Sequence, residues 1–298
     1  MSCDWLLGHL DSPDVRVVQV DDDGLAFEVG HVPGAAFLCW HADLGSRASR
    51  DLLDAVGFAD LMDRLGIAFD TTVVLYGDQM NLWAAYAWWV MRLWGHPDVR
   101  LLDGGYAAWA RAGLPMVGGA PGAGPPVPSG AGPLAPSRRD SSDPAGLPHL
   151  AYPVPREPRR GLRAFRADVE RALATGEVTV VDVRSPAGYQ GEVVLGGLTP
   201  PLIGAIRGGH IPGALSLPWV SLLDPETGLL LGLDELRRSS VAAGVRFDRP
   251  VIVYCELGAS SGLVCLVLGE ILGHPSVANY DGSWLEWAAA IGAPVSTV

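Results

Sequence analysis

Residues 251–262 read VIVYCELGASSG, and the fold of the whole chain can be worked out from this stretch. An apolar run ends abruptly at Cys255, and a loop of small residues leads into a second apolar run. The first run predicts a strand buried on both faces, and the second predicts a helix. Because parallel sheets bind ligands at the carboxyl ends of their strands, we expect the thiol of Cys255 to lie where chemistry can occur.

The composition predicts a globular protein without a membrane span, a signal peptide or a nucleic-acid-binding surface. The chain has 298 residues, enough for two domains with a core each. No apolar run reaches the length of about 18 residues that suggests a membrane span, and Asp4 stands where a signal peptide would be basic. We therefore expect a cytoplasmic protein. The net charge is −12 and all 21 basic residues are arginine, so neither nucleic acid nor a membrane is predicted as a partner.

The four cysteines form neither a C-x-x-C pair nor a Cys/His cluster with zinc spacing, so the sequence predicts no metal site. We also expect no disulfide framework in a long chain of cytoplasmic character. Cys39 and Cys265 stand inside apolar stretches and are predicted to be small buried side chains. No pairing with another cysteine or a metal therefore explains Cys255, and its role must follow from its own position in the sequence.

The chain contains an internal repeat. Residues 71–115 match residues 249–294 at a constant offset of 178. Upstream, GHVPGA (30–35) pairs with GHIPGA (209–214), one residue away from that offset. A repeat unit of this length indicates a duplicated domain rather than a solenoid.

Residues that recur in both copies are expected to serve the fold. His210, Pro212 and Gly213 belong to GHIPGA, and GHVPGA repeats all three. Cys255, by contrast, falls on Gly77 in the first copy. The fold therefore does not require a cysteine there, and we interpret Cys255 as a nucleophile.

Three segments are predicted along the chain: a first domain over 1–117, a linker rich in proline and glycine over 118–160, and a second domain over 161–298. Each domain alternates short apolar runs with helical patterns. This order predicts the α/β class, with a mostly parallel sheet covered by helices on both faces. In the second domain the predicted strands are 178–183, 214–219, 250–255 and 277–282. The predicted helices there are 165–175, 233–244, 261–273 and 283–292.

The loop after Cys255 is suited to hold a negative sulfur atom. Gly258 gives the backbone conformational freedom, and the small residues Ala259, Ser260 and Ser261 leave room for successive amide groups to point inward. A ring of N–H donors at a helix N-terminus binds anions, and its field lowers the pKa of a thiol.

The motifs GHIPGA, VIVYCELGAS and YDGSWLEW together resemble the rhodanese family of sulfurtransferases in its tandem two-domain form. The resemblance covers both copies, and it implies that the second rhodanese-like domain is catalytic and the first is silent. In the C-x-x-G-x-[ST] loop of the family, the catalytic cysteine corresponds to Cys255, the glycine to Gly258 and the hydroxyl residue to Ser260.

The resemblance also implies a two-step reaction. Cys255 would take the sulfane sulfur of thiosulfate, become a persulfide and pass the sulfur to cyanide or a thiol. No cofactor is implied. The expected partners are a small-molecule sulfur donor and acceptor, and the sequence does not identify a partner protein.

The donor-binding positions depart from the family pattern. Glu256 and Leu257 stand where rhodaneses that prefer thiosulfate carry basic residues and where mercaptopyruvate enzymes carry Gly-Ser. Gly188 stands where a donor-binding arginine is common. We expect Arg184 to be a structural partner of Asp182.

The remaining arginine near the implied site is Arg207, which we expect either to bind the anionic donor or to lie in a solvated loop. The candidate substrate-binding residues are Glu256, Leu257, Gly258, Ala259, Ser260, Ser261 and Arg207. Among the aromatic residues, Trp83, Tyr86, Trp88 and Trp89 have helical spacing and are predicted to be core, with Trp83 also a candidate to line the site.

Three alternatives stay open. A 3-mercaptopyruvate sulfurtransferase would use the same cysteine with another donor. A non-catalytic sulfur-binding module would result if Glu256 prevented donor binding. A cysteine phosphatase or arsenate reductase would need a longer loop with an arginine to hold an oxyanion, and residues 255–261 contain none.

Overall fold

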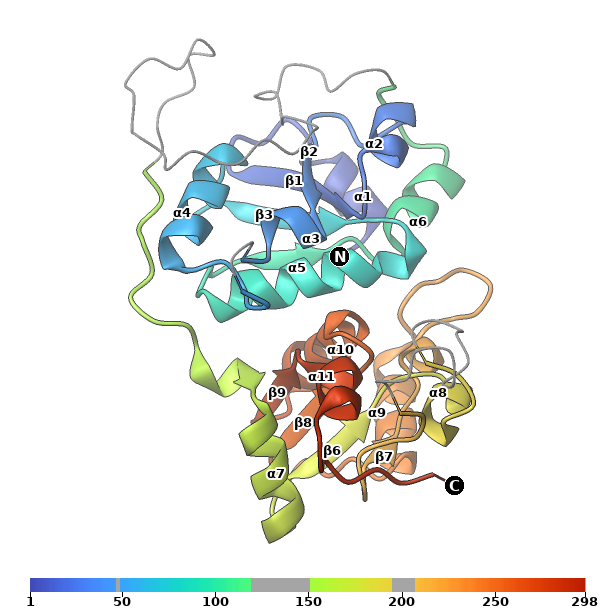
Figure 1. Ribbon diagram of the computed structural model, residues 1–298. Helices are drawn as coiled ribbons and strands as arrows, with labels where there is room; N and C mark the ends of the chain where they lie inside the picture. The colour runs from blue at the N-terminus through green and yellow to red at the C-terminus, as the bar shows by residue number, and fades with distance from the viewer. Residues whose placement is uncertain (47–48, 119–150, 195–206, 298) are drawn as a thin grey trace. The chain divides into compact units, whose positions relative to one another are not determined.

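The computed structural model describes residues 1–46, 49–118, 151–194 and 207–297 (Figure 1). These residues form two compact units. Unit 1 comprises the described residues of Met1–Ala87 and Trp94–Pro158, and unit 2 comprises Trp88–Leu93 and those of Arg159–Val298. Most of the predicted linker, 118–160, lies outside the described residues, so its structure stays a prediction.

Unit 1 is built on a parallel sheet of four strands in the order β2-β1-β3-β4. The strands are β1 (Val15–Asp21), β2 (Ala36–Cys39), β3 (Thr72–Tyr76) and β4 (Val99–Leu101). The helices are α1 (Cys3–Leu7), α2 (Leu25–Val29), α3 (Trp40–Asp43), α4 (Ala55–Arg64), η1 (Gln79–Asn81), α5 (Leu82–Leu93) and α6 (Gly105–Arg111). The second half of α5, Trp88–Leu93, is counted with unit 2.

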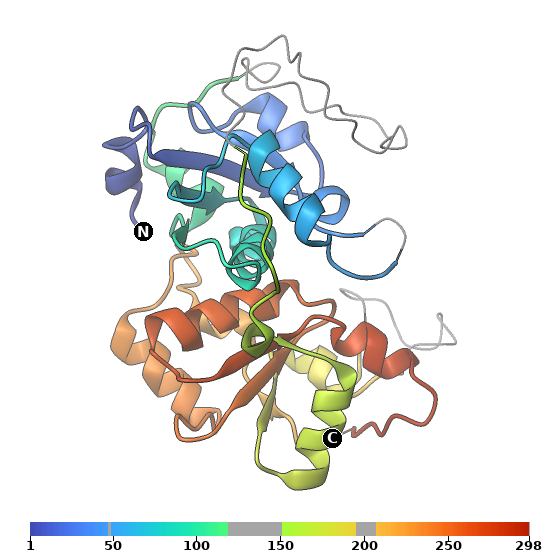
Figure 2. The ribbon, with the colours of Figure 1, turned by 90° about the vertical axis from the view of Figure 1, so that its left-hand side faces the viewer.

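Unit 2 is built on a parallel sheet of five strands in the order β5-β9-β8-β6-β7. The strands are β5 (Arg163–Ala164), β6 (Thr179–Asp182), β7 (Leu215–Ser216), β8 (Val251–Tyr254) and β9 (Val277–Tyr280). The helices are η2 (Arg160–Leu162), α7 (Arg166–Thr175), α8 (Pro186–Gln190), η4 (Trp219–Leu222), α9 (Leu233–Ala242), α10 (Ala259–Cys265), the π-helical turn η5 (Leu266–Ile271) and α11 (Ser283–Ala289). Figures 1 and 2 show these strands running side by side among the helices.

The two sheets share one topology, which confirms the predicted duplication and the α/β class. Reversed, the order in unit 2 becomes β7-β6-β8-β9, which matches β2-β1-β3-β4, with β5 added at one edge. The same hydrogen bond recurs in both units. The hydroxyl of Tyr76 accepts from the backbone N–H of Val32 at 2.9 Å, and that of Tyr254 accepts from Ile211 at 3.0 Å.

The repeated GH[VI]PGA motif serves the fold, as the sequence predicts. His31 stacks on Phe27 with ring centroids 3.8 Å apart, and His210 stacks on Tyr189 at 3.7 Å. Gly213 has a φ of 74°, which a residue with a side chain rarely adopts. The histidines and the glycine therefore fix a turn in each unit.

The predicted elements of the second domain are present with bounds that differ by one to several residues, and two differences have a structural reason. The strand expected over 214–219 is assigned only at Leu215 and Ser216, and although the N–H groups of Leu217 and Trp219 still donate to the carbonyls of Asp182 and Val183, the chain enters the 3-10 helix η4 at Trp219. The helix expected from residue 261 begins two residues earlier, at Ala259, because the positive φ of 95° at Gly258 turns the chain at once.

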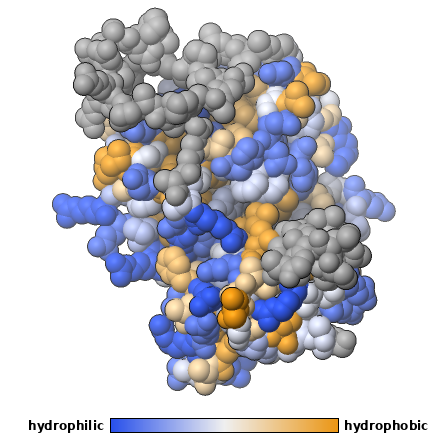
Figure 3. Space-filling view, viewed as in Figure 1, coloured by the Kyte–Doolittle hydropathy of each residue, from blue (hydrophilic) through white to orange (hydrophobic). Residues whose placement is uncertain are grey.

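No helix in the described part of the chain is long and apolar enough to cross a membrane. On the face drawn in Figure 3, hydrophobic residues are scattered among hydrophilic ones. Scattered exposed hydrophobic side chains are normal on a protein surface.

Candidate active site

Cys255 lies at the carboxyl end of β8, as the sequence predicts. All four residues of β8 are buried, as expected for a central strand, between β6 and β9, of a parallel sheet whose two faces are covered by helices. The cysteine itself is 2% exposed. The strand therefore delivers a buried thiol to the edge of the sheet where α10 begins.

Gly258 forms the turn between Cys255 and α10. A side chain at this position would be strained, because φ is 95° and a Cβ atom would lie 2.8 Å from the Cα atom of Asp281. The conformation directs the N–H of Gly258 at the Sγ atom of Cys255, at 3.1 Å. This amide is the one donor of the predicted ring for which the structure gives a contact with the sulfur. The participation of the Ala259 and Ser260 amides stays a prediction.

A hydroxyl group also lies beside the sulfur. The Oγ atom of Ser261 is 3.5 Å from Sγ and donates to Oδ1 of Asn279 at 2.7 Å. The Nδ2 atom of Asn279 donates in turn to the carbonyl of Gly258 at 2.9 Å. The resemblance pointed to Ser260, whereas the hydroxyl in contact with the sulfur belongs to Ser261.

The turn between β9 and α11 holds the backbone of Cys255. The hydroxyl of Ser283 accepts from the N–H of Cys255 at 3.1 Å and donates to the carbonyl of Tyr280 at 2.7 Å. The N–H of Trp284 donates to the carbonyl of Cys255 at 3.1 Å. The N–H of Leu285 donates to the carbonyl of Glu256 at 3.0 Å.

Asn279 and Ser283 were missed by reasoning from the sequence. Asn279 is 0% exposed, and a polar residue in the apolar run VANY was an available signal, because a buried amide needs hydrogen-bond partners. Ser283 offered no comparable signal. Serine is common where a helix begins.

Arg184 and Asp182 form a buried ion pair, which confirms their predicted pairing. Nη2 of Arg184 lies 2.7 Å from Oδ2 of Asp182, and it also donates to the carbonyl of Gly209 at 2.6 Å. Burial lowers the pKa of Arg184, but the hydrogen bonds and the charge of Asp182 outweigh it, and the pKa ends above its ordinary value. The Nη1 atom, which has no hydrogen-bond partner among the described residues, lies 3.8 Å from Oε2 of Glu256.

The other loop residues differ in exposure. Glu256 and Leu257 are half-buried, whereas Ala259, Ser260 and Ser261 are buried in the first turn of α10. The loop brings no positive charge close to the sulfur.

Arg207 caps a helix. Its guanidinium donates to four backbone carbonyls at and after the end of α11, those of Trp287, Ala288, Ala290 and Ala293. Its own carbonyl accepts from the indole of Trp284 at 3.0 Å. Arg207 is exposed and lies outside the helices and strands, so both donor binding and the alternative of a loop arginine stay predictions.

Gly77 takes the place of the cysteine in unit 1. The N–H of Tyr106 donates to its carbonyl at 2.9 Å, which repeats the bond from Trp284 to Cys255. A Cβ atom at Gly77 would overlap the carbonyl oxygen of Val20 and lie 3.1 Å from Oδ1 of Asp21. The glycine is therefore required by the local packing of unit 1.

Cys39 and Cys265 differ from one another. Cys39 is half-buried, and its Sγ lies 3.1 Å from the carbonyl of Asp22 and 3.3 Å from Nε2 of His41. The prediction of an apolar setting for Cys39 is therefore wrong. Cys265 is buried as predicted, and burial raises the pKa of its thiol.

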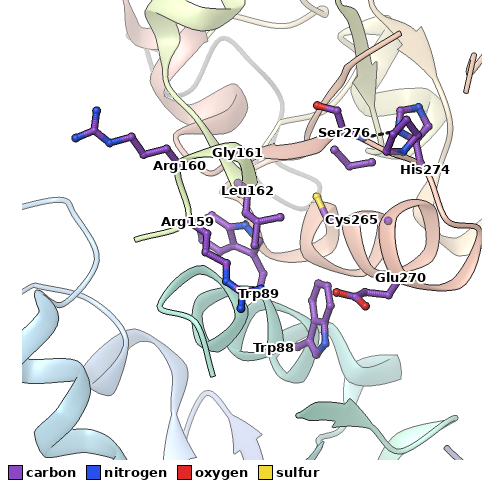
Figure 4. A pocket seen from close by; sticks show the side chains of 13 residues that line it. Trp88, Trp89, Arg159, Arg160, Gly161, Leu162, Cys265, Glu270, His274 and Ser276 are labelled. Atoms are coloured by element: carbon purple, nitrogen blue, oxygen red, sulfur yellow. Dashed lines mark hydrogen bonds between the residues drawn. The ribbon is translucent and has the colours of Figure 1, made fainter. Parts of the chain in front are cut away.

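A pocket of about 380 Å³ within unit 2 is lined by Cys265 rather than by Cys255 (Figure 4). Trp88, Trp89 and Glu270 also line it, and no residue of the loop 255–261 does. The indole of Trp89 donates to the carbonyl of Leu162 at 2.8 Å. The pocket is therefore separate from the sulfur of Cys255.

The predicted aromatic core is confirmed, since Trp83, Tyr86, Trp88 and Trp89 are all buried. Trp83 stacks on Trp40 with ring centroids 4.1 Å apart. Its role in lining the site stays a prediction. In the part of the chain that the structure describes, no group of three or more His, Cys, Asp or Glu residues is arranged to hold a metal ion.

Both halves of the chain are similar to known proteins. The family model described as Rhodanese-like domain matches residues 2–112 and 165–290. The sulfur carrier protein TtuD of Thermus thermophilus is 40% identical over 301 residues, covering 99% of this chain and 95% of its own length. The thiosulfate sulfurtransferase of Corynebacterium glutamicum is 38% identical over 298 residues, covering 100% of this chain and 90% of its own.

A solved structure is also similar to this chain over almost its whole length. SseA from Escherichia coli, whose structure is described under 3-mercaptopyruvate sulfotransferases, superposes with a TM-score of 0.72 at 27% identity. The superposition covers 95% of this chain and 98% of SseA. Matches in both halves, together with the shared sheet topology of units 1 and 2, lead to one conclusion. The chain belongs to the rhodanese family and carries two rhodanese-like domains in tandem.

Proposed function

We propose that the protein is a sulfurtransferase that moves sulfane sulfur from thiosulfate to cyanide or a thiol through a persulfide on Cys255. The thiolate attacks the outer sulfur of thiosulfate. A new S–S bond forms, the old one breaks, and sulfite leaves with its electron pair. Cyanide then attacks the terminal sulfur, thiocyanate leaves and the thiolate returns.

The observation that carries this proposal is the contact of 3.1 Å between the N–H of Gly258 and the sulfur of Cys255. An N–H group fixed in this way stabilises a negative sulfur atom without any rearrangement during the reaction. The hydroxyl of Ser261, at 3.5 Å, can turn its proton to the sulfur when that atom is charged. Burial of the site strengthens both interactions, because water does not compete with them.

The relatives support sulfur transfer but differ in donor. One is named a thiosulfate sulfurtransferase, one a sulfur carrier protein, and the solved structure is linked to 3-mercaptopyruvate. At position 257 this chain has a leucine, which offers no hydroxyl to a mercaptopyruvate carboxylate. We therefore place thiosulfate first and 3-mercaptopyruvate second.

Intact-mass spectrometry after incubation with thiosulfate tests the proposal. We expect a gain of one sulfur atom that maps to Cys255, release of sulfite, and loss of the extra sulfur when cyanide is added. The Cys255→Ser variant is the control and should gain none. An unmodified Cys255, or the same gain in the variant, would overturn the assignment. A parallel incubation with 3-mercaptopyruvate, read out as pyruvate release, separates the two donors.

A further inference from the structure

We propose that Cys39 is a second reactive thiol, with His41 as its base, which forms a mixed disulfide with small disulfides of the form R–S–S–R. The inference concerns unit 1 and goes beyond the proposed function, because it needs neither Cys255 nor a persulfide. It follows from the contacts of this thiol and from a comparison of the two copies.

Cys39 lies where a small molecule can reach it. It is the last residue of β2, an edge strand of the parallel sheet, and α3 begins directly after it. Ligands of parallel α/β sheets bind outside the carboxyl ends of the strands. Cys39 is half-buried and His41 is exposed. Both groups are therefore open to a small disulfide from solvent.

The thiol and the imidazole are placed for the transfer of a proton. Sγ of Cys39 lies 3.3 Å from Nε2 of His41 and 3.1 Å from the carbonyl oxygen of Asp22, and Nε2 lies 2.9 Å from the same oxygen. In the tautomer protonated at Nδ1, Nε2 can accept the thiol proton. The N–H group that results donates to the carbonyl of Asp22, which stabilises the charged imidazole. A nucleophile within reach of a base, with the base held by a third group, is the arrangement of an activated thiol.

The surroundings of the thiol make a base necessary. Burial and the charges of Asp43 and Asp22 raise the pKa of the Cys39 thiol, so little thiolate is present at neutral pH. The carboxylate of Asp43 is fixed beside the thiol, since Oδ2 accepts from the N–H of Cys39 at 2.9 Å and Oδ1 lies 2.6 Å from Nη2 of Arg64. Removal of the proton by His41 is therefore the route to the nucleophile.

The second copy has neither the thiol nor the imidazole. Beyond GH[VI]PGA the first copy continues as AFLCWHADL and the second as LSLPWVSLL. The central tryptophan recurs, and a short helix begins at it in each unit, at Trp40 and at Trp219. Cys39 and His41, however, are replaced by a proline and a valine. The fold therefore requires neither residue, and the same comparison distinguished Cys255 from the residues that serve the fold.

The reaction balances with the disulfide as the oxidant and the thiol as the reductant. The proton of Cys39 passes to Nε2 of His41, and the thiolate attacks one sulfur atom of the disulfide. An S–S bond to Cys39 forms, the S–S bond of the disulfide breaks, and a small thiolate leaves with the electron pair. His41 then gives the proton to this leaving group. The products are a mixed disulfide on unit 1 and one small thiol.

The test measures the rate at which Cys39 of the full chain forms a mixed disulfide with bis(2-hydroxyethyl) disulfide. This probe is uncharged, so the neighbouring carboxylates neither attract nor repel it. Trypsin cuts after arginine, and the peptide 17–47 contains Cys39 as its only cysteine. The mass of this peptide therefore reports Cys39 separately from the other thiols.

Two variants are compared with the wild type between pH 6 and pH 9. The side-chain amide of His41→Gln can still donate to the carbonyl of Asp22 but cannot take up a proton. His9→Gln is the matched control, because it removes another imidazole of unit 1, which stacks on Trp5 and lies 2.7 Å from its carbonyl.

We expect His41→Gln to slow the reaction of Cys39 at pH 7 by at least about tenfold, the lower end of the effect of a positioned base. In the wild type the rate should level off above the range of about pH 5–8 in which imidazoles titrate. In His41→Gln it should keep rising to pH 9, because only direct ionisation of the thiol then supplies the nucleophile. His9→Gln should react as the wild type does.

A Cys39 that stays unmodified in the folded wild type would overturn the inference. Equal rates in His41→Gln and the wild type would also overturn it, because the thiol would then react without the base. If His41→Gln had a lower melting temperature than the wild type, the wild-type pH profile would decide, and a rate that rises steadily to pH 9 would refute the base. The state of Cys255 enters none of these outcomes, so the inference and the proposed function are tested separately.

Discussion

The hydroxyl of Ser283 accepts a hydrogen bond of 3.1 Å from the backbone N–H of Cys255, although 28 positions separate the two residues. Ser283 holds this position with a φ of 54°, in the left-handed region. The matching residue of unit 1 is Gly105, with a φ of 55°. Unit 2 thus keeps a strained serine where unit 1 has a glycine, and the gain is an acceptor for the amide of Cys255.

Two substitutions at Ser283 distinguish the effect of the lost hydrogen bond from the effect of the backbone strain. Ser283→Ala should destabilise unit 2 by about 1–3 kcal/mol, because the buried N–H of Cys255 loses its acceptor. Ser283→Gly loses the same acceptor but suits the backbone, so it should be more stable than the alanine variant by about 1 kcal/mol. Both variants should form the persulfide more slowly than the wild type. Urea unfolding and single-turnover sulfite release measure the two effects, and equal stability of the two variants would refute the role of strain.

Gly258→Ala should disrupt the site. The positive φ costs an alanine about 1–2 kcal/mol, and its Cβ would press on Asp281, so the loop must shift. A displaced amide no longer points at the sulfur, and we expect kcat/KM to fall by at least about tenfold. Gly269→Ala is the matched control, since no atom lies within 4 Å of its Cβ position. Full activity in Gly258→Ala would show that this amide does not stabilise the sulfur.

The two cysteines of the α10 region should respond differently to substitution. Cys255→Ser should abolish sulfur transfer and leave the melting temperature close to that of the wild type, because serine resembles cysteine in size. Cys265→Ala should destabilise the protein by about 1–2 kcal/mol or less through the loss of one buried sulfur, and should keep its activity. Substantial thiocyanate formation by Cys255→Ser would contradict the assignment of the nucleophile.

Asp21 should make the stability of unit 1 depend on pH. Burial raises the pKa of this carboxyl from 3.8 to about 6, although Gln19 and the N–H of Asp78 donate hydrogen bonds to it. Between pH 4 and 6 the folded state therefore binds more protons at Asp21 than the unfolded state does. The contribution of Asp21 to stability is thus largest below pH 4 and falls as pH rises through 6.

The Asp21→Asn variant tests this dependence. A rise in pKa from 3.8 to about 6 corresponds to about 3 kcal/mol. The stability of the variant minus that of the wild type should therefore increase by up to about 3 kcal/mol between pH 4 and pH 7. Hydrogen exchange of peptides from β1 reports the local stability at each pH. A difference that does not change with pH would show that Asp21 titrates normally.

Most of the fold could be predicted from the sequence, because the signals are local. Runs such as VIVY are apolar throughout, which is typical of a strand in a sheet covered on both faces. The internal repeat then identified the turn histidines and glycines as structural. Cys255 was found in the same way, as a residue that one copy has and the other lacks.

The remainder of the site depends on which strands are neighbours. Asn279 reaches Ser261 because β8 and β9 pair with Val253 opposite Asn279, and no local pattern encodes that register. Arg207 finds its partners at the end of α11, more than 80 residues away. Cys39 follows an apolar run, but β2 is an edge strand, so its end is only half-covered.

The packing around Gly77 limits which residues unit 1 can accept at this position. A side chain there would overlap the carbonyl of Val20, so a single change of Gly77 to cysteine cannot be accommodated without a shift of the backbone. The strand bearing Val20 would have to move first, and β1 pairs with strands on both sides. Backbone geometry at the end of β3 therefore opposes any side chain at position 77, and a thiol there would require a change in the backbone as well as in the residue.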